Sequence, residues 1–132
     1  AGARRALMLP VSAPFHSSLL APAALRLQAY LRDVRIDAPH FAVINNVDVA
    51  SVEEPEAIRD ALARQARSPV RWVETVRAIA ARGVSTLIEC GPGKVLNGLT
   101  RRIDERLDAL AIVDPASLDL ALAAVGREAV DR

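Results

Sequence analysis

The chain has 132 residues, of which 52% are hydrophobic and 25% are charged, and its formal net charge is +1. This length and composition are typical of one globular domain with a real core. Acidic residues balance the basic ones and only 3% of residues are aromatic, so we expect no nucleic-acid partner. No apolar run approaches the roughly 20 residues of a membrane span and no signal peptide is evident, so we expect no membrane partner either.

The single cysteine, Cys90, excludes an internal disulfide and fits a reducing cytosol, which predicts a cytoplasmic protein. We expect Cys90 to pack as a small buried hydrophobe. Two widely separated histidines and one cysteine give no metal-ligand spacing, so we expect no metal and no resident cofactor. The chain begins at Ala1 without a methionine, and we therefore interpret it as a piece of a longer protein.

The chain opens with a predicted strand followed by a helix. Residues 5–11 form a short apolar run bounded by proline, which is typical of a strand. Ser17 or Ser18 can cap the next helix, and Pro22 suits an early helical position. Apolar residues then recur at helical spacing, which predicts one buried stripe.

A second strand and a second helix are predicted next. Residues 41–49 read as a strand that Asn45 and Asn46 interrupt. Acidic side chains at residues 53–56 open a helix, where the helix dipole favours negative charge. Pro69 ends that helix, because the residue before a proline disfavours helical geometry.

The second half alternates helices with strands. It predicts a helix closed by Gly83, a strand over 84–90, a helix after the turn at 91–94, a strand over 109–113 and a helix from Pro115. The alternation favours an α/β layered arrangement with mostly parallel strands. Two apolar stripes are expected to face its core: Leu96, Leu99, Ile103 and Leu107, and then Leu118, Leu122 and Val125.

His16 is the strongest candidate for a chemical role. It lies where the first predicted strand gives way to a helix, and histidine takes up and returns a proton near neutral pH. A histidine base needs a partner for its other ring nitrogen. Gln65 falls in the last turn of its predicted helix, where a carbonyl free of helical partners could accept the histidine N–H. The alternatives are a structural histidine and a glutamine bonded to nearby backbone.

No nucleophile motif accompanies His16, because the chain contains no G-x-S-x-G turn. The sequence therefore looks like half of an active site. The glycine-rich turn at residues 91–94 could bind an anion through free N–H groups, although tight strand-to-helix packing is the favoured interpretation. Asn45 and Asn46 need hydrogen-bonded amides if they are buried, and they either organise a site or simply make a turn.

Four ordered motifs resemble the C-terminal part of the malonyl-CoA:acyl-carrier-protein transacylase family, nearly end to end. They are Leu-Pro-Val-Ser-Ala-Pro-Phe-His-Ser at 9–17, Ile-Asn-Asn-Val-Asp at 44–48, Gln65 followed by Ser-Pro-Val-Arg-Trp at 68–72, and Glu-Cys-Gly-Pro-Gly-Lys-Val-Leu at 89–96. The resemblance implies an α/β fold. Residues 13–132 would be the C-terminal part of an α/β-hydrolase-like acyltransferase large domain, and residues 1–12 would end a ferredoxin-like small subdomain with its last strand.

The resemblance also implies an activity. In this family a serine in G-H-S-x-G attacks malonyl-CoA, a histidine activates the serine, and the malonyl group passes to the phosphopantetheine thiol of acyl carrier protein in fatty acid biosynthesis. His16 matches that histidine, and Gln65 matches the residue whose main-chain carbonyl orients it. The serine, its oxyanion-hole partner and the carboxylate-binding arginine belong to the missing N-terminal half. We therefore expect the chain alone to be inactive.

The resemblance leaves Phe15 and Asn46 as candidates for substrate binding. In related polyketide acyltransferases, phenylalanine before the histidine goes with malonyl units and serine goes with methylmalonyl units. A phenyl ring would fill the space that an α-methyl group needs. Two alternatives stay open: the acyltransferase domain of a polyketide synthase, and a non-catalytic piece or split subunit that joins a partner carrying the serine.

Overall fold

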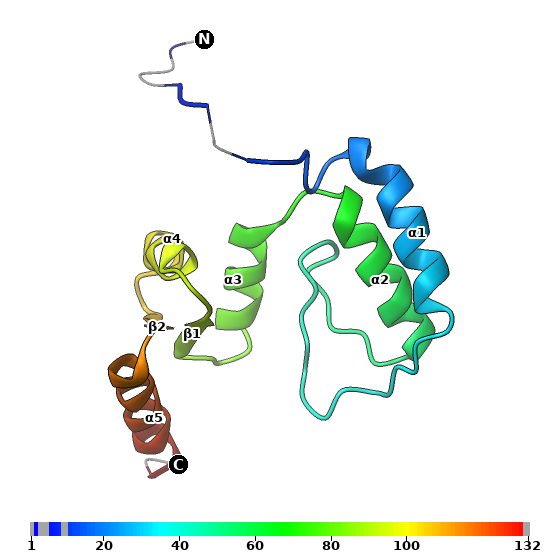
Figure 1. Ribbon diagram of the computed structural model, residues 1–132. Coiled ribbons are helices and arrows are strands. Elements are labelled where there is room, and N and C mark those ends of the chain that lie inside the picture. The colour runs from blue at the N-terminus through cyan, green and yellow to red at the C-terminus, as the bar shows by residue number, and fades with distance from the viewer. Residues whose placement is uncertain (1, 3–5, 9–10, 131–132) are drawn as a thin grey trace. The chain divides into compact units, whose positions relative to one another are not determined.

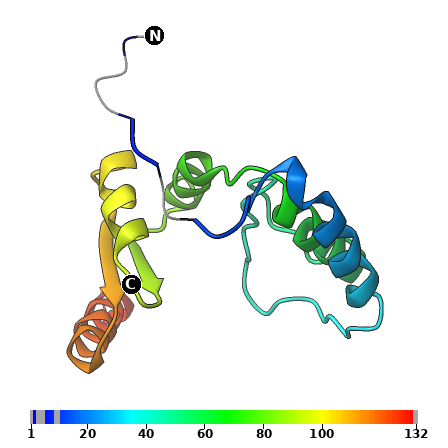
Figure 2. The same cartoon turned by 45° about the horizontal axis from the view of Figure 1, so that its top comes forward.

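The computed structural model describes residues 2, 6–8 and 11–130 of the chain. Contacts divide the chain into two compact units, Ala1–Val70 and Arg71–Arg132, and each is described by itself (Figures 1 and 2). No helix in the described part of the chain combines the length and apolar character needed to cross a bilayer.

The first unit is a pair of antiparallel helices connected by a long loop (Figure 1). A 3-10 turn, η1 (Ser18–Leu20), leads into α1 (Ala21–Leu31), and α2 (Pro55–Arg67) returns beside it. Each α-helix has a proline in its first turn, where a missing N–H costs nothing. Small side chains at the contact bring the two helices close. The buried residues there are Ala24, Leu31, Ala61 and Ala63.

Arg59 of α2 completes the C-terminal end of α1. Its Nε donates to the Leu31 carbonyl at 2.8 Å, and its Nη2 donates to the Val34 carbonyl at 2.7 Å. The last carbonyls of a helix have no partner within the helix, so this guanidinium satisfies them. The loop that leaves α1 is therefore attached to α2 from its first residues.

The connecting loop corrects the predicted strand over residues 41–49. Ile44 makes only an isolated antiparallel bridge. The Asn45 side chain accepts a hydrogen bond from the Asp48 N–H at 2.7 Å, so it stabilises a turn in place of a strand ladder. Val49 has a φ of 59°, which lies outside the strand region. The prediction of a strand was wrong because the asparagine side chain competes for the backbone groups that a ladder would use.

The strand predicted over residues 5–11 is not formed at the residues described there. Residues 6–8 and 11 have no regular secondary structure, and residues 5, 9 and 10 lie outside the described residues. A strand forms by pairing with a neighbour, and the described part of the chain offers this segment none. The assignment of residues 1–12 to a ferredoxin-like subdomain stays a prediction.

The second unit has the predicted alternation of helices and strands. Its elements are α3 (Trp72–Ala80), β1 (Thr86–Cys90), α4 (Val95–Ile103), β2 (Asp108–Ile112) and α5 (Pro115–Val130). β1 and β2 pair in parallel, with Thr86 opposite Asp108. Figure 1 shows α4 and α5 on opposite sides of this strand pair. The predicted α/β class with parallel strands is confirmed.

The core of the second unit is small. Val76 of α3 is fully buried, and Leu107, Ala109 and Ala121 are nearly so. The two predicted inward stripes are only partly buried, because two strands and their helices cannot cover every apolar face. Ile103 is half-buried and Leu107 is buried, whereas the remaining stripe residues are exposed: Leu96, Leu99, Leu118, Leu122 and Val125.

Cys90 is exposed, so the expectation of a buried cysteine was wrong. It is the last residue of β1, where the strand ends at the edge of the sheet. The periodic pattern identified the strand correctly, but burial decreases toward the end of a short strand that few elements cover.

Asp114 caps the N-terminus of α5. Its carboxylate accepts hydrogen bonds from the Ser117 hydroxyl and N–H, both at 2.7 Å, and these bonds hold the pKa of Asp114 below its usual value. A carboxyl whose pKa is lower in the folded state stabilises the fold above the unfolded pKa of about 3.9. That contribution is lost as the pH falls through the folded pKa.

We therefore expect Asp114→Ala to lower the melting temperature at neutral pH, and the difference from the parent chain to shrink in acid. Thermal unfolding followed by circular dichroism at several pH values measures this. Asp119→Ala removes an exposed carboxylate from the same helix and serves as the control. A destabilisation by Asp114→Ala that is independent of pH would contradict the capping role.

Candidate functional site

The structure brings His16 and Gln65 together in the first unit. His16 Nδ1 lies 2.9 Å from the main-chain oxygen of Gln65, a residue 49 positions away in the chain. A carbonyl oxygen only accepts hydrogen bonds, so Nδ1 carries the proton and Nε2 of the neutral ring keeps its lone pair. His16 is also exposed. A fixed imidazole with an open Nε2 has the geometry that a general base requires.

Pro69 explains why the Gln65 carbonyl is available. In a continuing helix this oxygen would accept from the N–H four residues later, and that residue is Pro69, which has no N–H. Ser68 has already left helical geometry, with φ −117° and ψ 150°. The end of α2 therefore presents a free acceptor, and His16 uses it.

The turn that carries His16 is held by local hydrogen bonds. The Phe15 N–H donates to the Ala13 carbonyl at 2.9 Å, and the Ser17 hydroxyl donates to the Pro14 carbonyl at 2.7 Å. His16 itself has a φ of 57°, in the left-handed region that residues other than glycine rarely adopt. Backbone strain of this kind concentrates at functional sites, so the turn is a candidate for a functional role in its own right.

Asn46 and Phe15 take different places around the His16–Gln65 pair. The Asn46 N–H donates to Gln65 Oε1 at 3.3 Å, so its backbone contacts the glutamine side chain. The Asn46 Oδ1 is buried and has no hydrogen-bond partner within the described structure. Phe15 adjoins His16 in sequence and is 62% exposed. The structure thus places Asn46 against Gln65 and leaves the Phe15 ring open beside His16.

Arg64 is a charged neighbour of the site that the sequence analysis missed. Its two terminal nitrogens bind the two carboxylate oxygens of Asp48 at 2.6 and 2.7 Å, and its Nε binds Asp60 at 2.6 Å. These hydrogen bonds raise the pKa of Arg64 above its ordinary value, so it stays charged. The spacing of Asp60 and Arg64 on one helix face was a visible signal. The partnership with Asp48 was not visible.

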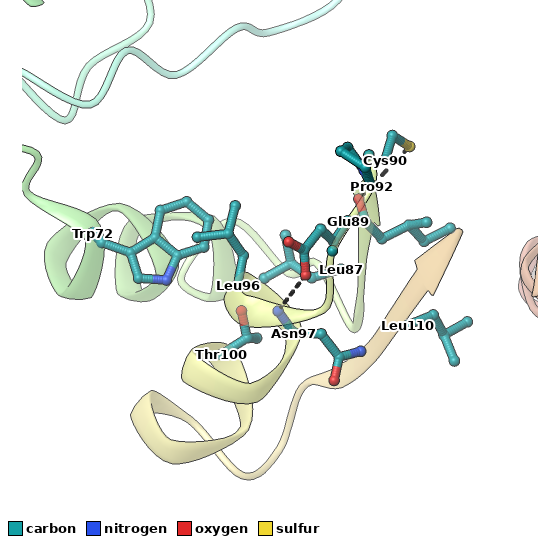
Figure 3. A pocket seen from close by; sticks show the side chains of 12 residues that line it. Trp72, Leu87, Glu89, Cys90, Pro92, Leu96, Asn97, Thr100 and Leu110 are labelled. Atoms are coloured by element: carbon teal, nitrogen blue, oxygen red, sulfur yellow. Dashed lines mark hydrogen bonds between the residues drawn. The ribbon is translucent and has the colours of Figure 1, made fainter. Parts of the chain in front are cut away.

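The glycine-rich turn lies in the second unit, beside a cavity of about 340 Å³ (Figure 3). Figure 3 shows the Glu89 carboxylate accepting from the Asn97 N–H at the start of α4, at 2.8 Å. This carboxylate takes the place at the helix N-terminus that a bound anion would use. The contact supports the packing interpretation of residues 91–94 over anion binding.

The described site supplies a proton acceptor and its orienting carbonyl, but no nucleophile. Ser17 is next to His16, yet its hydroxyl donates to the Pro14 carbonyl. Among the residues that the structure describes, no group of three or more His, Cys, Asp or Glu could hold a metal ion. By itself the arrangement can take and return a proton at Nε2 of His16.

Comparison with known proteins identifies relatives of the chain. No protein-family profile matches it. It is 52% identical over 122 residues to the malonyl CoA-acyl carrier protein transacylase of Salmonella typhimurium. It is 42% identical over 127 residues to the protein of that name from Bacillus subtilis. The two alignments cover 92% and 96% of this chain, but only 40% of each relative.

Solved structures agree with this. An acyl-carrier-protein S-malonyltransferase from Burkholderia pseudomallei matches with a TM-score of 0.87 and 62% identity, over 92% of this chain and 40% of its own. A type II PKS acyl-carrier protein in complex with its malonyl-transacylase matches with a TM-score of 0.89 and 51% identity, over 93% of this chain and 40% of the other. The predicted resemblance and the acyltransferase fold class are confirmed, and the chain spans about 40% of the length of these relatives.

Proposed function

We propose that this chain, which is homologous to about 40% of the malonyl CoA-acyl carrier protein transacylases, is the histidine-bearing C-terminal part of such an enzyme. The complete enzyme would transfer a malonyl group from CoA to the phosphopantetheine thiol of an acyl carrier protein, for fatty acid biosynthesis in the cytoplasm. The observation that carries the proposal is the His16–Gln65 hydrogen bond of 2.9 Å, which prepares Nε2 to act as a base. The reaction needs no resident cofactor, because both acyl carriers are substrates.

In the first half-reaction, Nε2 of His16 takes the proton of a serine supplied by the rest of the enzyme. The serine oxygen attacks the thioester carbonyl of malonyl-CoA. When the carbon–sulfur bond breaks, the imidazolium returns the proton to the departing CoA thiolate. In the second half-reaction, His16 takes the proton of the carrier-protein thiol, whose sulfur attacks the acyl-serine, and returns it to the serine oxygen.

Two features of this chain support that role for His16. The Gln65 carbonyl accepts from Nδ1 in both protonation states, so the ring keeps its orientation while Nε2 gains and loses a proton. The carbonyl belongs to the last turn of α2, where the negative end of the helix dipole favours an imidazolium. Gln65 therefore acts through its main chain, as an orienting residue.

A transfer assay tests the proposal. The complete enzyme, mixed with malonyl-CoA and phosphopantetheinylated carrier protein, should load malonyl onto the carrier, which mass spectrometry detects. The 132-residue chain alone should load none, because it lacks the serine motif. A complete enzyme that neither forms an acyl-serine nor loads the carrier would refute the function.

A second candidate is that the chain acts as a binding piece that must join a partner carrying the serine. Large apolar side chains exposed on both units favour it, among them Phe41 at 77% and Leu120 at 68%. Exposed apolar surface of this kind marks interaction sites. Monomeric behaviour with sharp two-state unfolding would argue against this candidate. Ketosynthase or carrier sequence flanking the chain would instead assign it to a polyketide synthase.

Phe15→Ser in the complete enzyme is expected to relax selectivity against methylmalonyl-CoA. The ring beside His16 would fill the space of an α-methyl group, and serine would vacate it. A single methyl group is worth about tenfold or more in discrimination, so the ratio of kcat/KM for methylmalonyl-CoA to that for malonyl-CoA should rise about tenfold. Phe41→Ser, at another exposed phenylalanine, is the matched control. An unchanged ratio would remove Phe15 from the pocket.

A further inference from the structure

The turn between residues 45 and 50 is built by its own hydrogen bonds. The Asn45 N–H and Nδ2 both donate to the Ala50 carbonyl, at 3.0 and 2.9 Å, and the Asn45 carbonyl accepts from the Val49 N–H at 3.1 Å. With the Asp48 N–H on Asn45 Oδ1, the side chain of Asn45 fixes both sides of the turn. Asn45 is buried, so water competes little for these bonds. The turn is therefore a compact unit that is formed without α2.

Two consecutive residues of α2 fasten this turn to the helix. Arg64 grips the Asp48 carboxylate with two parallel hydrogen bonds, the geometry that fixes direction as well as distance. The Gln65 side chain accepts from the Asn46 N–H. Both attachments fall in the last turn of α2, which otherwise ends at Arg67 without a side-chain cap.

We infer that Arg64 and Asp48 are positioning residues for His16, acting through the last turn of α2. A helix end frays unless other groups hold it, and a frayed last turn would displace the Gln65 carbonyl that accepts from Nδ1. The Arg64–Asp48 pair joins that turn to the compact loop, so the carbonyl keeps its place. The link to catalysis rests on the proposed function, whereas the link to the His16 ring does not.

The state of the His16 ring tests the inference without any activity. In the 132-residue chain labelled with ¹⁵N-histidine, nitrogen chemical shifts at a pH where the ring is neutral report which nitrogen carries the proton. The parent chain should show His16 with its proton on Nδ1. Asp48→Asn keeps the size of the side chain and removes the charge-assisted pair. It should lower the ratio of the Nδ1–H form to the Nε2–H form by about tenfold, the scale of one lost hydrogen bond.

Asp37→Asn is the matched control, because Asp37 lies in the same loop and also pairs with an arginine, Arg35, but both side chains are exposed. It should leave the His16 ratio unchanged. If Asp48→Asn unfolds the chain, Arg64→Lys replaces it, since lysine keeps the charge but cannot make the two parallel bonds. A folded Asp48→Asn or Arg64→Lys chain with the parent ratio would overturn the inference.

In the complete enzyme the same Asp48→Asn change should lower kcat for malonyl transfer by about tenfold and leave KM for malonyl-CoA unchanged, as expected for a misplaced base. Asp48→Glu, which keeps a carboxylate, should recover part of kcat. A shifted tautomer ratio in an enzyme without transfer activity would refute the proposed function alone. An unchanged ratio in an active enzyme would refute the positioning role alone.

Discussion

Replacing His16 with alanine is expected to lower kcat for malonyl transfer by about 10³-fold to 10⁴-fold in the complete enzyme. The structure gives the reason: Nδ1 is held by the Gln65 carbonyl at 2.9 Å, so Nε2 is the nitrogen that exchanges protons with the serine and the two thiols. Without it the serine attacks as a poorly activated hydroxyl. KM for malonyl-CoA should change little, because His16 contributes to proton transfer more than to binding.

The second histidine of the chain provides the control for this experiment. His40 is exposed in the loop after Pro39 and has no role in the proposed reaction, so His40→Ala should leave kcat and KM near those of the parent. Rapid-quench measurement of the acyl-serine distinguishes loss of the first half-reaction from loss of the second. Near-normal transfer by His16→Ala would end the assignment of His16 as the base.

Replacing Val76 with aspartate is expected to unfold residues 71–132. Val76 on α3 is the fully buried side chain at the centre of that small core. An unpaired carboxylate there costs several kcal/mol, about 3 kcal/mol or more, because no partner replaces its lost hydration. Domains of this size are stable by only about 5–15 kcal/mol, so the loss takes a large share of the total.

Val73 is the matched control, because it lies on the same helix and is 45% exposed. Val73→Asp should change the free energy of unfolding by roughly 0.5 kcal/mol or less. Urea titration followed by the fluorescence of Trp72, the single tryptophan of the chain, reports on this unit directly. Equal effects of the two substitutions would show that the α3 face assignment is wrong.

The Gly-Pro punctuation and the apolar periodicity of the second half were enough to predict its secondary structure. Gly83 has a φ of 82° and ends α3 as expected, because glycine adopts this geometry without a side-chain clash. β1 and β2 lie within two residues of their predicted bounds. Signals that act between near neighbours in sequence are legible without the fold.

The same reasoning failed where a side chain competes with the backbone. Residues 41–49 carry the apolar residues of a strand, yet Asn45 spends its amide on the groups that a ladder needs. Composition alone does not reveal whether an asparagine will interrupt a strand or replace it with a turn. That depends on whether a partner strand lies alongside, and among the described residues this segment has only the bridge at Ile44.

For the candidate site, the sequence by itself determined the residue types and one geometric condition. His16 stands at a turn, and Pro69 leaves the Gln65 carbonyl without a helical donor. Only the tertiary structure decided that these two groups meet, and that Arg64 and Asp48, 16 residues apart, hold the helix end beside them. The physical reason is range: a helix end follows from a few adjacent residues, whereas a contact across 49 residues exists only once α1 and α2 have packed.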